Sequence, residues 1–232
     1  MSKNLIIGMG EIGKAVTEVV GSAQTLDIEK KAIELPIEVL HICFPYTEHF
    51  KAEVRQYMST YRPEHTIIWS TVPIGTCADI DSKIVHSPPE GVHPYLADSI
   101  YQMERWIGYN EKPECYYFVN YFQELGLRTK EVPSTYFTEA LKLLSTTEYG
   151  INIEFARYKK TVADDLDMPY ELMKEWNQSY NKLYKNLGME KRFQKYVLDA
   201  PEGPKGGHCI TPNARLLNEQ YPSEFTKIVG EL

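Results

Sequence analysis

Three glycines near the N-terminus have the spacing of a turn that binds a dinucleotide. Gly8, Gly10 and Gly13 form the pattern G-x-G-x-x-G, after the apolar run 4–7 and before the amphipathic run 14–21. In this setting the first glycine allows a tight turn, the second lets the backbone approach a pyrophosphate, and the third lets a helix pack against a strand. The helix N-terminus offers free amides to the phosphates. We therefore predict a cofactor-binding turn made of Gly8, Met9, Gly10, Glu11, Ile12 and Gly13.

An acidic residue follows at the distance at which this kind of fold binds a ribose. Asp27 lies 19 residues after Gly8, where a carboxylate can accept a hydrogen bond from the ribose 2′-hydroxyl. Because a carboxylate repels a 2′-phosphate, NAD is favoured over NADP, although Lys30 and Lys31 weaken this preference. The alternative is a glycine turn in a helix-covered sheet that binds no ligand.

Cys209 is the candidate nucleophile of the second half of the chain. Its thiol ends a loop with glycines at 203, 206 and 207, and it lies beside Lys205 and His208. Neighbouring cations favour the thiolate, which is the reactive form. The alternative is an inert thiol, but the glycine-rich setting favours a functional one.

The remaining cysteines and the histidines do not form a recognisable metal site. The spacing of the cysteines fits neither a zinc site nor a disulfide-dense secreted scaffold, so we expect a reducing cytoplasm. The histidines also match no metal motif, and no metal is predicted. We expect three of the cysteines to fill the core: Cys43, Cys77 and Cys115.

Strands and helices alternate in the first part of the chain. Alternation of this kind predicts an α/β, Rossmann-type fold, a mostly parallel sheet with helices on both faces. The expected strands are 4–7, 25–27, 39–44, 66–70, 83–86 and 105–108. The expected helices are 14–21, 47–61 and 113–126.

After Pro133 the pattern becomes helical. Ser134 is a good N-cap for a long helix, whose apolar positions repeat in steps of four and three: Phe137, Leu141, Leu144, Ile151, Phe155, Tyr158 and Val162. This seam is either the core face of one helix or a surface that pairs with a second copy of the chain. Helices are also expected at about 170–187, 213–220 and 223–231, with a loop at 199–209. We therefore predict a dinucleotide-binding domain at 1–133 and a helical domain with a long central helix at 134–232.

Composition narrows the classes of function. The 232 residues include 25 Lys+Arg and 32 Asp+Glu, for a formal net charge of −7. This acidic balance argues against nucleic-acid binding, which needs a basic face. No apolar run approaches the ~20 residues of a membrane span, and the start of the chain does not have the pattern of a signal peptide.

Five stretches together resemble the UDP-glucose/GDP-mannose dehydrogenase family. In chain order they are Gly8–Gly13, Ile42–Pro45, Ser70–Thr76, Glu139–Leu143 and Gly206–Ile210. Members of this family use NAD to oxidise the primary alcohol of a sugar nucleotide to a carboxylate in two hydride transfers. The resemblance covers nearly the whole chain but leaves no counterpart for the family's C-terminal nucleotide-sugar-binding domain, so it implies a shortened form. It also implies that the helical domain at 134–232 is a substrate and dimerisation domain, with a small-molecule substrate and a homodimer through the 134–163 helix.

The resemblance implies a role for individual residues. Thr71 would lie beside the nicotinamide and a catalytic water, and Phe44 and Pro45 would lie beside the cofactor. Glu90 would take part in acid and base steps, and Lys142 would stabilise alkoxide-like charge. Three of these side chains have a plainer alternative: Thr71 as a strand-end hydroxyl, Glu90 as a solvated loop carboxylate and Lys142 as a solvated helix lysine.

Cys209 matches the nucleophile of the family. Its thiolate would attack the aldehyde formed by the first oxidation, the thiohemiacetal would lose a second hydride, and water would cleave the resulting thioester. The chain departs from the pattern at Thr146, where the family has Asn, and at Asn213, where it has Asp. An amide cannot act as a carboxylate base, so the hydrolysis step is in doubt.

Two alternative functions therefore stay open. One is an enzyme with a single hydride transfer, such as a β-hydroxyacid-type dehydrogenase. The other is a non-catalytic NAD-binding or oligomerisation protein that has the same fold.

Overall fold

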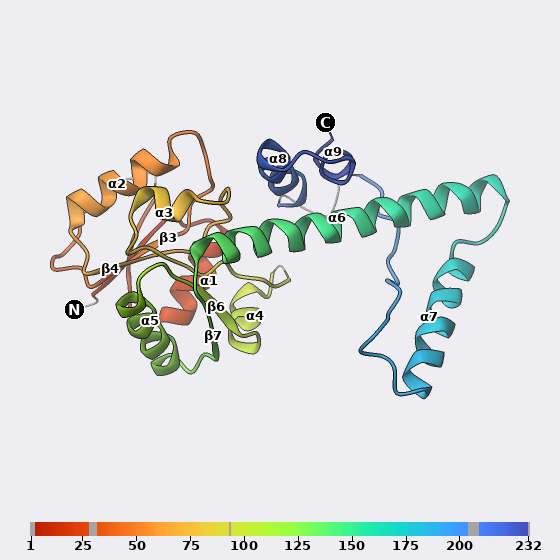
Figure 1. The fold of residues 1–232 in the computed structure, drawn as a ribbon, viewed down its shortest axis with the longest axis horizontal. Coiled ribbons are helices and arrows are strands. Elements are labelled where there is room, and N and C mark those ends of the chain that lie inside the picture. Colours follow the sequence, from red (N-terminus) through yellow and green to blue (C-terminus); the bar gives the residue numbers. More distant parts are fainter. Residues whose placement is uncertain (1–2, 28–31, 93, 204–208, 232) are drawn as a thin grey trace. The chain divides into compact units, whose positions relative to one another are not determined.

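The chain folds into two compact units. The computed structural model describes residues 3–27, 32–92, 94–203 and 209–231. Contacts within the chain separate Met1–Leu143 from Leu144–Leu232, and the division falls inside the long helix α6 (Thr135–Asp165). The elements of each unit are drawn in Figure 1.

The first unit contains a seven-stranded sheet in the order β2-β1-β3-β4-β5-β6-β7. All neighbouring strands are parallel except β5 and β6, which are antiparallel and pair at His86 and Gly108. The strands are β1 (Asn4–Ile7), β2 (Gln24–Leu26), β3 (Val39–Ile42), β4 (His65–Ile68), β5 (Val85–His86), β6 (Arg105–Gly108) and β7 (Thr129–Val132). This sheet confirms the predicted Rossmann-type architecture.

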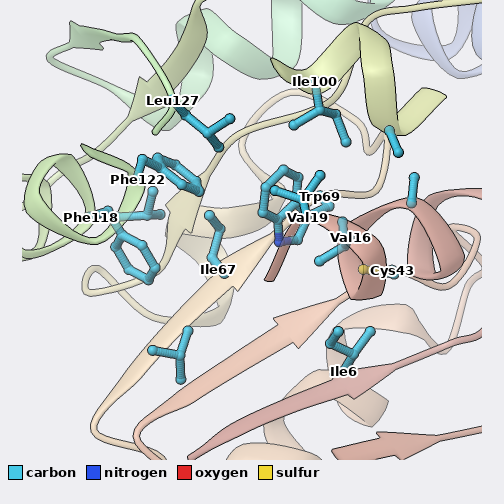
Figure 2. Close-up of a cluster of buried hydrophobic side chains, with 14 of the residues drawn as sticks. Ile6, Val16, Val19, Cys43, Ile67, Trp69, Ile100, Phe118, Phe122 and Leu127 are labelled. Atoms are coloured by element: carbon cyan, nitrogen blue, oxygen red, sulfur yellow. The ribbon is translucent and has the colours of Figure 1, made fainter. Parts of the chain in front are cut away.

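Helices cover both faces of the sheet because successive side chains of a strand point to opposite sides. Ile6 of β1 packs with α1, α4 and α5, whereas its neighbours Leu5 and Ile7 pack with α2 and α3. The helices are α1 (Glu11–Val20), α2 (Phe50–Tyr61), α3 (Thr76–Ile80), α4 (Leu96–Gln102) and α5 (Lys112–Glu124). Figure 2 shows the first of these two clusters, in which Trp69 lies among Val19, Ile67 and Ile100.

Three elements of this unit were not predicted from the sequence. They are the five-residue α3, the seven-residue α4 and the edge strand β7. β7 has the sequence TKEV, in which Val132 is the buried residue. Short elements and polar edge strands give little periodicity, and their pairing depends on neighbours distant in sequence.

The second unit is helical, as predicted. It contains the C-terminal part of α6 together with α7 (Glu171–Asn186), α8 (Ile210–Gln220) and α9 (Glu224–Gly230). The predicted N-cap at Ser134 is confirmed, because its hydroxyl accepts the Tyr136 N–H at 3.1 Å. At the start of α9, Ser223 forms a capping box with Thr226, which was not predicted. Residues 204–208 of the predicted loop lie outside the described residues. In the part of the chain that is described, no helix has both the length and the apolar character needed to span a membrane.

The apolar seam of α6 is largely exposed. Phe137, Leu141, Leu144, Phe155 and Tyr158 have exposed fractions between 46% and 64%. The seam is therefore not the core face of the helix in the single chain.

Candidate functional site

The glycine turn joins β1 to α1 with close backbone packing. Gly8 has a φ of +91°, and its N–H donates to the Leu26 carbonyl at 2.9 Å. A Cβ at Gly8 would lie 2.8 Å from the Phe44 nitrogen, and one at Gly13 would lie 1.8 Å from the Gly8 oxygen. The first and third glycines are therefore required by the fold, whether or not a ligand binds.

Gly10 differs from the other two because it faces open space. It is the N-cap of α1, and a Cβ added to it would meet no heavy atom within 4 Å. A phosphate group could approach the backbone there and meet the amides of the first turn. Glu11 is exposed in that turn, whereas Met9 and Ile12 are half-buried and pack against the core. Gly10 therefore leaves the N-terminal end of α1 open to solvent.

Asp27 lies just after β2 and near the aromatic residues of α2. It is exposed, and its charge is among the causes that raise the pKa of Tyr57, after burial, Glu53 and Tyr61. Tyr57 contacts Phe44, with ring centroids 6.0 Å apart. The carboxyl ends of β1, β2 and β3 therefore bring together the glycine turn, Asp27 and Phe44. Pro45 is exposed beside them, and Lys30 and Lys31 lie outside the described residues.

His86 links the segment that follows β4 to helix α6, a contact that the sequence did not predict. The pKa of His86 is lowered to about 4, mainly by burial, with contributions from Lys142 and Arg105. In the neutral ring, Nε2–H donates to the Ser70 carbonyl at 3.1 Å, and Nδ1 accepts from the Thr138 hydroxyl at 2.8 Å. His86 therefore joins the residue before Thr71 to the helix that carries Lys142. Thr71 itself is half-buried.

Lys142 and Glu90 are brought to the same segment of the first unit. The Lys142 ammonium donates to the Pro89 carbonyl at 2.7 Å, and Glu90 is the next residue. Both side chains are half-buried. The structure thus places a cation on α6 against the loop that carries the candidate acid and base, which the sequence alone did not show.

Two further charged residues of this region also were not singled out by the sequence. Arg105 is 1% exposed and donates to carbonyl oxygens of the loop after β5. Glu139 accepts the backbone N–H groups of Gly75 at 2.6 Å and of Cys77 at 2.8 Å, and its pKa is raised, mainly by burial. Glu139 belongs to one of the five motif stretches, so its presence there was a signal that could have been used.

The second unit brings Thr146 and Asn213 together. The Asn213 amide donates to the Thr146 hydroxyl at 3.3 Å, and Asn213 is 6% exposed. An amide therefore does stand beside position 146, but it comes from α8. Cys209 is exposed at the N-cap of the same helix, one turn before Asn213. The buried positions of the other three cysteines confirm that they fill the core.

The structure assembles the candidate residues as two groups. The glycine turn, Phe44, Thr71, Glu90 and Lys142 belong to the first unit, and the group of Thr146, Cys209 and Asn213 belongs to the second. No set of three or more metal-ligating side chains is gathered within the described ranges.

Comparisons with known proteins show that the fold of this chain occurs in solved structures of dehydrogenases. No protein-family model matches the sequence, and no curated protein has a matching sequence. Among solved structures, the chain is similar to the UDP-D-ManNAc dehydrogenase of Pyrococcus horikoshii, with a TM-score of 0.75, 16% identity, and coverage of 98% of this chain and 68% of that one. The UDP-glucose dehydrogenase of Pyrobaculum islandicum gives a TM-score of 0.71, 13% identity, and coverage of 98% and 67%.

A shorter dehydrogenase matches over more of its own length. The 3-hydroxyisobutyrate dehydrogenase of Mycobacterium tuberculosis, in a structure with L-serine, has a TM-score of 0.70 and 10% identity, and coverage is 98% of this chain and 91% of that one. The fold is thus shared with both kinds of dehydrogenase. The resemblance seen in the sequence motifs is confirmed at the level of the fold, and this chain spans about two thirds of the nucleotide-sugar enzymes that it resembles.

Proposed function

We propose that the protein is an NAD-dependent dehydrogenase that oxidises an alcohol group of a small molecule, as nucleotide-sugar 6-dehydrogenases do. The observation that carries this proposal is the glycine turn, which is closed by packing at Gly8 and Gly13 and open at Gly10. This turn lies between β1 and the N-terminus of α1, which is the place where this kind of fold binds a pyrophosphate. Asp27 supports NAD rather than NADP, because its carboxylate would repel a 2′-phosphate.

Lys142 and Glu90 are proposed to support the first oxidation. When bound, NAD accepts a hydride from the alcohol carbon. As the hydroxyl loses its proton, its oxygen gains alkoxide-like negative charge, which the compact Lys142 ammonium can stabilise until the hydride leaves and the carbonyl forms. Glu90 can accept the hydroxyl proton, directly or through a water near Thr71. The Pro89 carbonyl orients the ammonium through its 2.7 Å hydrogen bond.

Cys209 is proposed to take the product through a second oxidation. Its thiolate adds to the aldehyde carbon and forms a thiohemiacetal. Loss of a hydride from that carbon to a second NAD leaves a thioester, and water cleaves it to the acid and the free thiol. Asn213 cannot supply the base for hydrolysis, because its amide has no basic site at working pH and donates to Thr146.

The exposed thiol allows a direct test. Purified protein is given NAD and a panel of sugar nucleotides and β-hydroxyacids, and the NADH formed per substrate oxidised is measured. The proposal predicts two NADH per substrate for the wild type and one for Cys209→Ser, with aldehyde as the product of the variant. Cys115→Ser is the matched control, since Cys115 is a buried thiol far along the chain from the proposed site. A ratio of one for the wild type would reject the thioester route.

A single-hydride β-hydroxyacid-type dehydrogenase is the second candidate. It is favoured by the 91% coverage of the 3-hydroxyisobutyrate dehydrogenase chain, against 68% and 67% for the nucleotide-sugar enzymes. The amide at Asn213 also suits a route that has no thioester to hydrolyse. This candidate predicts one NADH per substrate and the same rate for Cys209→Ser as for the wild type. NAD binding with no turnover of any substrate would instead identify a non-catalytic NAD-binding protein.

We also propose that two copies of the chain pair along α6. The exposed seam of this helix supports the pairing, because contiguous apolar side chains on a surface mark interaction sites. A cytoplasmic setting is proposed as well, since it would keep the exposed Cys209 thiol reduced.

A further inference from the structure

Arg105 is a buried cation whose hydrogen-bond partners belong to one short segment of backbone. It begins β6 and is 1% exposed. Its Nη2 lies 2.7 Å from the Pro88 carbonyl oxygen, 3.0 Å from the Ser87 carbonyl oxygen and 3.2 Å from the Ser87 hydroxyl. No ion pair with a carboxylate at hydrogen-bonding distance is found for it among the described residues, although the charge of Glu90 acts on it. The buried guanidinium of Arg105 therefore donates to backbone carbonyl oxygens and not to a carboxylate.

The packing around Arg105 fixes its direction. Its guanidinium carbon lies 5.4 Å from the centroid of the Trp69 ring, which is itself fully buried in the core (Figure 2). Its Nε–H is buried and has no hydrogen-bond partner in the described part of the chain. Leaving this buried donor unpaired costs free energy. Within the described residues, the hydrogen bonds that the Arg105 side chain does make all come from Nη2 and go to the segment after β5.

The segment Ser87–Glu90 is held by hydrogen bonds from residues of other elements. Ser87 is tied to β4 because its N–H donates to the Ile68 carbonyl at 3.0 Å. The next two residues, Pro88 and Pro89, have no backbone N–H with which to continue the sheet. Beyond Ser87, the carbonyl of Pro88 is held by Arg105 and the carbonyl of Pro89 by Lys142. The position of Glu90 follows from these bonds.

We infer that Arg105 is a positioning residue that sets the Ser87–Glu90 segment, and through it both the Lys142 ammonium and the Glu90 carboxylate. It acts through the carbonyls of Ser87 and Pro88, without touching the reacting atoms. Its effect on turnover rests on the proposed function, whereas its effect on Lys142 does not.

Reactivity of the Lys142 amine tests the inference without any turnover. Arg105→Met, Arg105→Lys and Arg128→Met are compared with the wild type by timed acetylation with acetic anhydride and peptide mass spectrometry. Arg128 is the matched control, because it is exposed and donates to the Gln102 carbonyl elsewhere in the same unit. The acetylation rate of Lys142, divided by that of the exposed Lys83, should rise several-fold in Arg105→Met. It should rise less in Arg105→Lys, whose single ammonium cannot span the same acceptors, and stay unchanged in Arg128→Met.

Folding of the variants is judged from circular dichroism and from urea denaturation, both of which should show a folded protein. If Arg105→Met does not fold, the comparison is made with Arg105→Lys. An unchanged Lys142 ratio in a folded Arg105 variant would overturn the inference. So would an equal rise in Arg128→Met, which would show general loosening.

Kinetics then separate the inference from the proposed function. In an active enzyme, Arg105→Met should lower kcat by about 10²-fold, since a misplacement of about 1 Å at a reacting group has an effect of that size. The Kd for NAD should not change. If the wild type turns over no substrate, the proposed function fails while the acetylation result still decides the role of Arg105. A normal kcat in a folded Arg105→Met enzyme would overturn the positioning role.

Discussion

The two units of the chain differ in how they are held together. In the first unit, a sheet is covered on both faces by helices, and its two apolar clusters contain most of the large buried side chains. In the second, the buried apolar cluster consists of Ile153, Ile210, Ala214 and Val229. The first unit has a core typical of a stable domain, whereas the second has little apolar burial of its own.

Polar contacts to the backbone take the place of a core around α7. None of the side chains of α7 is buried, and Trp176 is 72% exposed. The extended segment after it is held by side-chain amides: Asn177 donates to the Tyr196 carbonyl at 2.8 Å, and Asn181 both donates to and accepts from the Lys195 backbone at 2.8 Å. The first unit therefore has an apolar core on both faces of its sheet, whereas α7 in the second unit is held mainly by hydrogen bonds to backbone groups.

The largest effect is expected at the glycine turn of the first unit. Gly13→Val places a side chain 1.8 Å from the Gly8 carbonyl, where the atoms that must move belong to the backbone. We expect a loss of more than about 4 kcal/mol in unfolding free energy, measured by urea denaturation. Gly10→Ala is the matched control, because its Cβ meets nothing within 4 Å. It should keep the stability and weaken only NAD binding; equal stability losses in the two variants would contradict the structure.

Acid should weaken the first unit next most strongly. Burial lowers the pKa of His41 to about 3 and is the main cause that lowers that of His86 to about 4. The unfolded chain, with histidine pKa values near 6.5, binds more protons than the folded one below that pH, so stability is present above pH 6.5 and is lost as the pH falls. From pH 6.5 to 5 each histidine should cost about 2 kcal/mol. The raised pKa of Glu139 acts in the opposite direction and offsets part of this loss.

His41 provides the variant for this measurement. Its Nδ1 accepts the Trp69 indole N–H at 3.1 Å, so protonation would place two donors against each other. Urea denaturation of the wild type and His41→Gln is compared at pH 7 and pH 5. The pH-dependent loss should be about half as large in the variant, and His49→Gln, at an exposed position, should behave as the wild type does. An equal loss in the wild type and His41→Gln would show that His41 is not buried in its neutral form.

A smaller effect is expected at Gly150, in the part of α6 that belongs to the second unit. A Cβ at Gly150 would lie 2.4 Å from Cγ1 of Val229 and 2.7 Å from Cγ2 of Ile210. Because these are side-chain atoms, Gly150→Ala should cost about 1–3 kcal/mol. Limited proteolysis should show earlier cleavage in 144–232 while 3–143 stays intact. Ser145→Ala, at an exposed position of the same helix, is the control, and simultaneous digestion of both units would contradict their independence.

The smallest change in the stability of the single chain is expected for substitutions in the apolar seam of α6. These substitutions also test whether two copies of the chain pair along this helix. Phe155 and Tyr158 are 58% and 64% exposed, so Phe155→Glu with Tyr158→Glu should change the stability of a monomer by about 0.5 kcal/mol or less. If two copies pair along the seam, light scattering coupled to gel filtration should show a dimer for the wild type and a monomer for the double variant. Ser145→Glu should remain dimeric. A monomeric wild type would remove the dimer from the proposal.

Much of the fold and part of the candidate site could be predicted from the sequence. The glycine turn, the alternation of strands and helices and the long helix after Ser134 follow from local rules of backbone conformation, side-chain period and capping. Two of the five motif stretches contain Lys142 and Cys209, and the resemblance to the dehydrogenase family also pointed to Glu90. These predictions needed only residues close together in the chain.

The tertiary structure alone decided which of these residues meet. The bond of Lys142 to Pro89 and that of Asn213 to Thr146 each join segments more than 50 residues apart. The roles of His86, Arg105 and Glu139 likewise depend on distant partners, because a buried charge or imidazole is specified by whatever surrounds it. Sequence patterns record the conformational preferences of neighbouring residues, whereas the environment of a buried polar group is set by packing between elements that the chain brings together only when it folds.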